Sequence, residues 1–167
     1  MAKLRHFTLF ILLLCACDSE TPGDISREYF KNSKIEFVSN QHYENEPVVE
    51  TGYIQSGDNI TFRYTFNHPQ QDEIADDELS EVFIFEIPKN ADSFSYSTSE
   101  SITNNVLIAD YRRACFCYFT GFDLQSATIS ANRISATAWQ VSFDIVIKDD
   151  YSEYPLKDSG IYRLGSL

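Results

Sequence analysis

Two close pairs of cysteines are the residues of this sequence best suited to covalent chemistry. Cys115 and Cys117 stand one residue apart in a run with a β pattern, so both side chains should point to one face of a strand. Their Cα atoms would lie about 6.5–7 Å apart, at the limit of disulfide geometry. Three interpretations stay open: two small buried hydrophobic side chains, a strained and reducible disulfide, or two ligands of a metal site.

A metal site at this pair would need further ligands. His42 and His68 are the only histidines after the first 16 residues, and neither stands at a zinc-type spacing from the cysteines. Six carboxylates between residues 72 and 81 offer oxygen ligands, but the segment lacks the interleaved glycine of calcium loops. We therefore expect no metal, and we expect this acidic segment to be a solvated surface.

Catalytic motifs are missing from the sequence. There is no G-x-S-x-G elbow, no H-E-x-x-H and no glycine-rich phosphate loop, and the whole chain has 6 glycines. The sequence therefore predicts a protein that is not an enzyme. The catalytic alternative would centre on His68 and the neighbouring acids.

The N-terminus carries the second cysteine pair. Lys3 and Arg5 precede an apolar run over residues 7–14, which is shorter than the approximately 20 residues that a transmembrane helix needs. The run ends in Leu14-Cys15-Ala16-Cys17. This ending resembles the lipobox of bacterial lipoproteins: an aliphatic residue, two small residues and the cysteine that receives the lipid. Cys17 fits better than Cys15, because Leu14 would be too bulky just before a cut at Cys15.

The lipobox resemblance implies a covalent lipid and a location. Diacylglycerol would be joined to the sulfur of Cys17, residues 1–16 would be removed, and the new amino group could take a further acyl chain such as palmitate. Two or more acyl chains hold a protein firmly on a membrane. We therefore expect an anchor in the bacterial cell envelope, at the outer membrane or cell surface, and no other cofactor.

The composition describes an acidic globular domain. The net charge is −12, and residues 1–16 contribute two basic and no acidic residues to it. This charge argues against a nucleic acid partner. We divide the chain into a signal peptide (1–16), the lipidated cysteine with a polar, flexible tether (17–33) and one β domain (34–167).

Apolar and polar residues alternate through most of the β domain, as in half-buried strands. The clearest runs are Ile60–Phe66 and Trp139–Ile147, and Trp139 lies on the apolar face of its run. Further strands are expected over residues 34–39, 48–55, 81–87, 93–98, 105–111, 114–120, 127–131 and 160–164. Ser56-Gly57-Asp58 and Asn132-Arg133 are the expected hairpin turns.

So many short strands predict an all-β fold. A β-sandwich of immunoglobulin-like architecture is the first choice, and a small lipocalin-like β-barrel is the alternative. Residues 129–147 are also similar to strands of small uncharacterised Bacteroidota lipoproteins, a resemblance that implies no established activity. We expect a non-catalytic binding module for an envelope protein, a peptide or a glycan; the alternative is a carrier of a small hydrophobic ligand. Tyrosines available for a sugar platform are Tyr111, Tyr118, Tyr151, Tyr154 and Tyr162.

Overall fold

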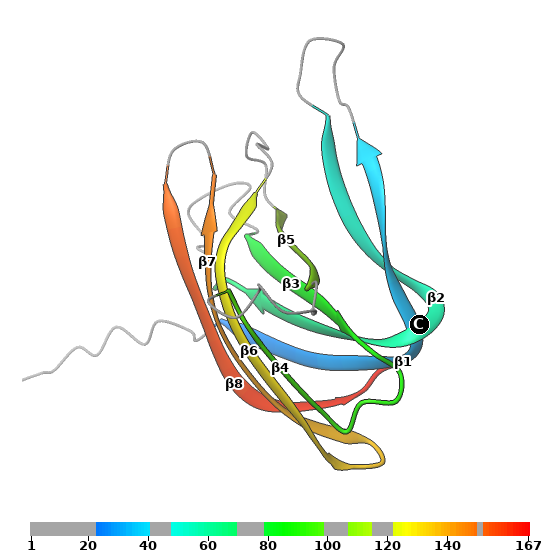
Figure 1. Cartoon of the computed structure of the whole chain (residues 1–167). Helices are drawn as coiled ribbons and strands as arrows, with labels where there is room; N and C mark the ends of the chain where they lie inside the picture. The colour runs from blue at the N-terminus through cyan, green and yellow to red at the C-terminus, as the bar shows by residue number, and fades with distance from the viewer. Residues whose placement is uncertain (1–22, 41–47, 70–78, 99–106, 115–121, 150–151) are drawn as a thin grey trace, which may run out of the picture.

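The computed structural model describes residues 23–40, 48–69, 79–98, 107–114, 122–149 and 152–167. Within these ranges the chain forms eight β-strands and no α-helix (Figure 1). The strands are β1 (Asp24–Asn40), β2 (Val49–Asn67), β3 (Ser80–Ile87), β4 (Ser93–Ser97), β5 (Ile108–Ala114), β6 (Asp123–Ser135), β7 (Ala138–Lys148) and β8 (Glu153–Leu164). The predicted all-β fold is confirmed.

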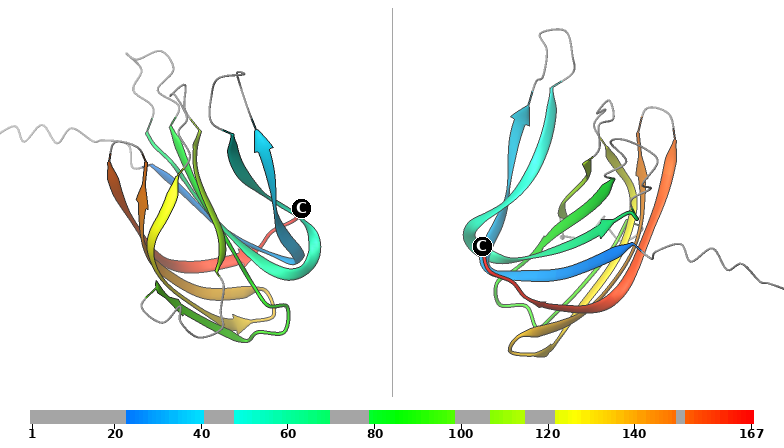
Figure 2. Two further views of the ribbon diagram at one scale, coloured as in Figure 1. Left: turned by 45° about the horizontal axis from the view of Figure 1, so that its top comes forward. Right: turned by 180° about the vertical axis from the view of Figure 1, so that it is seen from behind.

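All eight strands belong to one sheet, in the order β4-β6-β7-β8-β1-β2-β3-β5. Neighbouring strands are antiparallel except β1 and β8, which run parallel and pair at only two positions, Glu28 with Arg163 and Tyr29 with Leu164. The sheet curls into a half-barrel, so that its two halves face each other (Figure 2). A continuous curled sheet of this kind agrees with both a sandwich and a barrel description.

Aromatic side chains fill the inside of the half-barrel. Phe62 of β2 meets Trp139 of β7 edge to face at 5.4 Å between ring centroids. Phe143 of β7 contacts Tyr64 of β2 and Phe83 of β3, at 5.3 Å and 5.0 Å. Trp139 is completely buried, which confirms its predicted place in the core. Because each large apolar side chain contributes about 1.5–3 kcal/mol on burial, these contacts hold the two halves together.

The first strand begins earlier than the sequence suggested. Residues 24–33, which we had placed in the tether, form the first half of β1 and pair with β2. Two features of the sequence explain why this part of the strand was not predicted. Tyr29 and Phe30 are adjacent and both buried, on opposite faces, which breaks the period of two. Arg27 is charged, but its partner Asp158 lies 131 residues away in the chain.

The predicted turn at Ser56-Gly57-Asp58 is wrong. These residues lie inside β2, where β1 and β2 change register around Ser33. Ser33 pairs with both Ser56 and Asn59, so the intervening residues form a bulge. Asn32, beside the bulge, has a φ of 52°, a conformation that asparagine tolerates well. The glycine that suggested a hairpin turn therefore marks a bend in two long strands.

The second predicted turn is displaced along the chain. Asn132 and Arg133 belong to β6 and pair with Gln140 and Trp139 of β7. The predicted hairpin exists, but its connection is residues 136–137. Polar residues at exposed positions near the end of β6 looked like a turn, although they continue the strand.

Candidate functional site

Beyond the bulge, residues 34–40 of β1 and 49–55 of β2 form a bent two-stranded segment, which we call the arm. The arm covers the convex side of β3 and β5. The Gly52 amide donates to Oδ2 of Asp110 on β5 at 2.9 Å, and Nη1 of Arg112 donates to the Gly52 carbonyl at 3.3 Å. A Cβ at position 52 would lie 2.9 Å from Cβ of Asp110, so only glycine permits this approach.

A buried carboxylate fixes the bend at the base of the arm. Glu86 of β3 is 8% exposed and accepts hydrogen bonds from the Ile35 amide at 2.6 Å and from Nδ2 of Asn59. Next to it, Oγ of Ser33 lies 2.9 Å from Oγ1 of Thr61. The bulge frees backbone groups from the ladder, and these side chains satisfy some of them. These hydrogen bonds therefore fix the direction in which the arm extends from the sheet.

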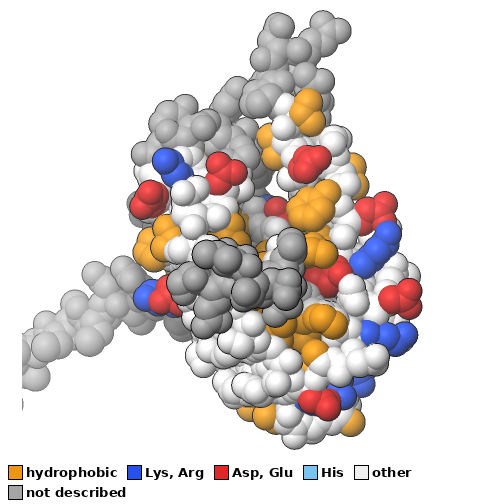
Figure 3. Space-filling model, in the orientation of Figure 1, with side chains coloured by type: hydrophobic (Ala, Val, Ile, Leu, Met, Phe, Trp, Pro, Cys, Tyr) orange, Lys and Arg blue, Asp and Glu red, His pale blue; other side chains and the backbone are white. Residues whose placement is uncertain are grey.

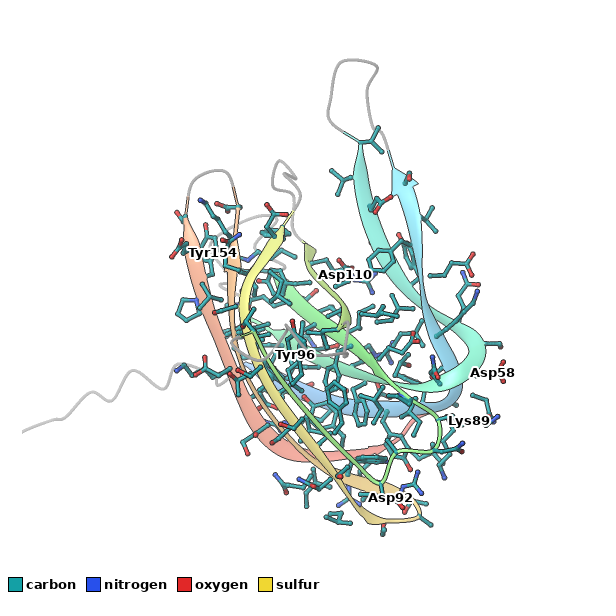
Figure 4. The ribbon with its side chains drawn as sticks, viewed as in Figure 1. Asp58, Lys89, Asp92, Tyr96, Asp110 and Tyr154 are labelled. Atoms are coloured by element: carbon teal, nitrogen blue, oxygen red, sulfur yellow. The ribbon has the colours of Figure 1, made fainter. Side chains whose placement is uncertain are left out.

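Apolar side chains are partly exposed on both faces of the arm, because Phe37 and Val38 are consecutive residues of β1. Phe37, Val38 and Tyr53 are each about 40% exposed, at 43%, 41% and 41%. Figure 3 shows hydrophobic side chains along the arm, with acidic and basic ones gathered at its outer side. Figure 4 shows Asp110 on β5, on the side that the arm covers. Burial raises the pKa of the Asp110 carboxyl, and the hydrogen bond from Gly52 lowers it in part.

A pocket of about 80 Å³ opens on the concave side of the sheet, between β5 and the strands β6 and β7. Its walls come from β3, β5, β7 and the start of β6. The lining residues are Phe83, Ala109, Asp110, Tyr111, Phe122, Leu124 and Ile147. Tyr111 meets Phe122 edge to face at 5.0 Å, so the pocket has aromatic walls.

A polar cluster lies next to this pocket. Nε of Arg113 donates to the Tyr111 hydroxyl at 2.9 Å, and it lies 3.3 Å from Oε1 of Glu81. The Arg113 guanidinium also sits 3.9 Å from the ring centre of Tyr154. His68 Nε2 is 3.8 Å from Glu81, and it has no hydrogen-bond partner in the described part of the chain. The cluster holds the end of β5 against β3 and β8.

The tyrosines that could have formed a sugar platform do not gather on the surface. Tyr111 is 7% exposed and Tyr162 is fully buried, and burial raises the pKa of both hydroxyls. Tyr154 is half-buried under Arg113. Tyr118 and Tyr151 lie outside the described residues. The described tyrosines thus serve packing and the polar cluster.

The sequence-predicted site residues mostly fall outside the described ranges. Cys17, Cys115, Cys117 and His42 all do, as does the acidic segment apart from its last carboxylate, Glu81. Among the residues that the structure describes, no three His, Cys, Asp or Glu side chains are arranged to hold a metal ion. The same ranges contain no helix with the length and apolarity of a membrane span.

Four residues that hold the arm or line the pocket were not predicted from the sequence: Glu86, Ala109, Asp110 and Arg112. One signal was available, because Asp110 and Arg112 alternate with Ala109 and Tyr111 and so predict two unlike faces of one strand. The position of the arm on one of those faces depends on a bend that no local pattern specifies. The sequence matches no protein-family model, and comparison with curated proteins and with solved structures gives no match either.

Proposed function

We propose that this chain is a lipoprotein anchored in the bacterial cell envelope through Cys17, and that its β domain binds a protein, peptide or glycan partner without catalysis. The observation that carries the proposal is the sequence Leu14-Cys15-Ala16-Cys17 at the end of an apolar run with a basic start. The β domain, which carries the arm and the pocket, follows this sequence in the chain.

The start of β1 at Asp24 supports a position of the domain close to the proposed anchor. Asp24 is seven residues after Cys17, and seven extended residues span at most about 25 Å. This spacing is shorter than the tether expected from the sequence, which ran to residue 33. A partner would therefore be met near the bilayer surface, which favours another membrane-associated molecule.

In the part of the chain that the structure describes, aromatic side chains fill the inside of the half-barrel, which supports a binding module over a carrier of a hydrophobic ligand. Pockets for small ligands measure approximately 300–1,000 Å³. The pocket beside β5 holds about 80 Å³, and aromatic side chains occupy the inside of the half-barrel. That space suits one side chain of a partner better than a whole lipid or cofactor.

The anchor is tested with the full-length chain in a bacterium that processes lipoproteins. Wild type and Cys15→Ala should incorporate radiolabelled palmitate and sediment with membranes, because Cys15→Ala keeps a small residue before the cut. Cys17→Ala should lose the label and move to the soluble fraction. A labelled Cys17→Ala variant, or an unlabelled wild type, would overturn the proposed anchor.

The binding role has its own test. Photo-crosslinking groups placed on the intact chain at Tyr53 and Ile108, both on the exposed surface near β5, should give a discrete adduct in native membranes. Groups at Ile161 and Lys157, on β8, serve as matched exposed controls. Equal labelling at all four positions would count against a specific partner at this surface.

A further inference from the structure

We infer that the arm is a lid on the convex face of β3 and β5, hinged at the bulge around Ser33, and that the charge of Asp110 favours its opening as the pH rises. This movement belongs to the chain itself and needs no partner, so it does not depend on the proposed function. Three features of the described residues support it: a hinge in the strands, attachments made by side chains, and a carboxyl that the closed arm covers.

The bulge between β1 and β2 provides the hinge. Ser33 pairs with both Ser56 and Asn59, and this interrupts the ladder between the two strands. The ladder is regular on either side of the interruption, over residues 24–31 and 34–40 of β1. A two-stranded segment beyond a bulge can change its direction and still keep its own hydrogen bonds. The arm can therefore move as one body about the bulge.

In the described part of the chain, side chains of the sheet attach the arm to β3 and β5, rather than a strand ladder. The ladder between β2 and β3 ends at Ile60, before the arm begins. Beyond it, the Ile35 amide donates to Glu86 of β3 at 2.6 Å. The Gly52 amide donates to Asp110 of β5 at 2.9 Å. These bonds can open without separating any pair of strands.

The closed arm covers an apolar side chain between these two attachments. Ile84 of β3 is the residue that pairs with Asp110, and it stands two residues before Glu86. Its neighbours in the chain belong to the core, so Ile84 points to the convex face, where it is 2% exposed. Ile35, on the arm, is 8% exposed. Opening would uncover both isoleucines, which keeps the open form a minor population.

Protonation of Asp110 is coupled to closure of the arm. Burial in the closed form raises the pKa of this carboxyl, and the Gly52 amide and the charge of Arg112 lower it in part. In the open form water would hydrate the carboxyl, and its pKa would return toward the ordinary value of 3.8. The closed form therefore binds the proton more tightly than the open form. It is favoured most below about pH 4, and the open population rises with pH until it levels off above the raised pKa.

Other charged groups surround Asp110 on the elements that pack here. Nη1 of Arg112 donates to the Gly52 carbonyl at 3.3 Å, and Glu86 forms the other attachment of the arm. The charges of the arm itself are exposed. They are Lys34 and Glu36, which form a salt bridge at 2.7 Å, and Glu50. Replacing Asp110 alone therefore separates its effect from that of the surrounding charges.

The test is amide hydrogen exchange, read residue by residue by NMR, on the full-length lipidated chain in nanodiscs between about pH 4 and pH 7. Protection at Ile35 and Gly52, whose amides bond to the sheet, should fall about threefold or more as the pH rises, after correction for intrinsic exchange. Protection at Glu36 and Tyr53, the intervening positions that pair within the arm, should not fall. Unchanged protection at Ile35 and Gly52, or an equal fall at all four amides, would overturn the inference.

Asp110→Asn isolates the titrating group. The variant keeps an acceptor for Gly52 but cannot ionise, so its protection at Ile35 and Gly52 should be the same at both ends of the pH range. Asp144→Asn, which removes an exposed carboxylate of β7, is the matched control and should retain the pH dependence of wild type. A pH dependence that persists in Asp110→Asn would belong to another group and would contradict the role of Asp110.

Gly52→Ala tests whether the arm moves as one body. An added Cβ would lie 2.9 Å from Cβ of Asp110, so the variant should hold the arm away from the sheet. Exchange at Ile35, at the other attachment, should then accelerate about tenfold at every pH, while circular dichroism stays like that of wild type. Normal exchange at Ile35 would mean that the two attachments open independently, and the arm would then not be a lid.

Discussion

Arg27 of β1 bonds Asp158 of β8 with two parallel hydrogen bonds, and Nε of Arg27 lies 2.8 Å from Oδ2 of Asp158. The Asp158 side chain is 6% exposed. β1 and β8 pair through their backbones at only two positions, so this ion pair joins them where the parallel ladder is missing. The hydroxyl of Tyr162 donates to the same carboxylate at 3.2 Å.

Removing one member of this pair should destabilise the domain strongly. Arg27→Leu leaves a nearly buried carboxylate without its cation, which costs about 3 kcal/mol of unfolding free energy. Asp144→Ala, which breaks the exposed pair with Lys157, should cost at most about 1 kcal/mol. Urea unfolding measures both. Equal losses in the two variants would contradict a structural role for the Arg27 pair.

Gly160 gives the Arg27 side chain its path to Asp158. A Cβ at position 160 would lie 2.5 Å from Nε of Arg27, so Gly160→Ala must displace the guanidinium. We expect Gly160→Ala to destabilise the wild type but to have little further effect in an Arg27→Leu background. A double-mutant cycle measures this coupling. Additive losses would mean that the alanine acts on the backbone of β8 instead.

Glu86 should control the position of the arm. Glu86→Ala removes the acceptor of the buried Ile35 amide, which costs about 2 kcal/mol. Hydrogen exchange should accelerate at the amides of the arm more than in β7. Glu50→Ala, an exposed change on the arm itself, is the matched control and should leave exchange unchanged. Uniform acceleration throughout the sheet would contradict a local role for Glu86.

Asp110 predicts a particular pH dependence of stability. Burial raises its pKa in the folded state above the value of 3.8, so the folded chain binds this proton more tightly than the unfolded chain. The contribution of Asp110 to stability is therefore largest in acid and falls as the pH rises above about 4. Asp110→Asn keeps an acceptor for Gly52 but cannot ionise.

We therefore expect the stability of Asp110→Asn, relative to wild type, to improve between about pH 4 and neutral pH. Urea unfolding across this range measures the difference. Asp144→Asn, at an exposed site, provides the baseline for loss of one surface charge. A relative stability that is flat, or that declines with pH, would contradict the burial argument.

The alternation of apolar and polar residues was sufficient to predict the bounds of a strand where that strand has one apolar face. β4 and the centre of β7 lie close to their predicted bounds, because alternation follows directly from one-sided burial. The pattern failed where both faces are covered. Phe30 is buried on the face opposite Tyr29, and Gly165 lies against its ring. At such positions the sequence does not alternate between apolar and polar residues, because both faces of the strand are buried.

The candidate site depended on contacts between distant segments, which the sequence did not reveal. Gly52 and Asp110 are separated by 58 residues, and Ile35 and Glu86 by 51. Each residue alone has an ordinary interpretation as a turn former or a surface acid. Their pairing follows from the bulge at Ser33, whose sequence signal was a glycine that suited a hairpin equally well.

The placement of β1 beside β8 has a consequence for biogenesis. Among the described strands, the first in the chain, β1, lies in the middle of the sheet, and its neighbour β8 is the last in the chain. A growing chain can assemble β1-β2-β3-β5 and β4-β6-β7 as separate pieces, but it cannot join them before residues 153–164 arrive. Folding should therefore be slow, because the two pieces keep apolar surface exposed until β8 joins them.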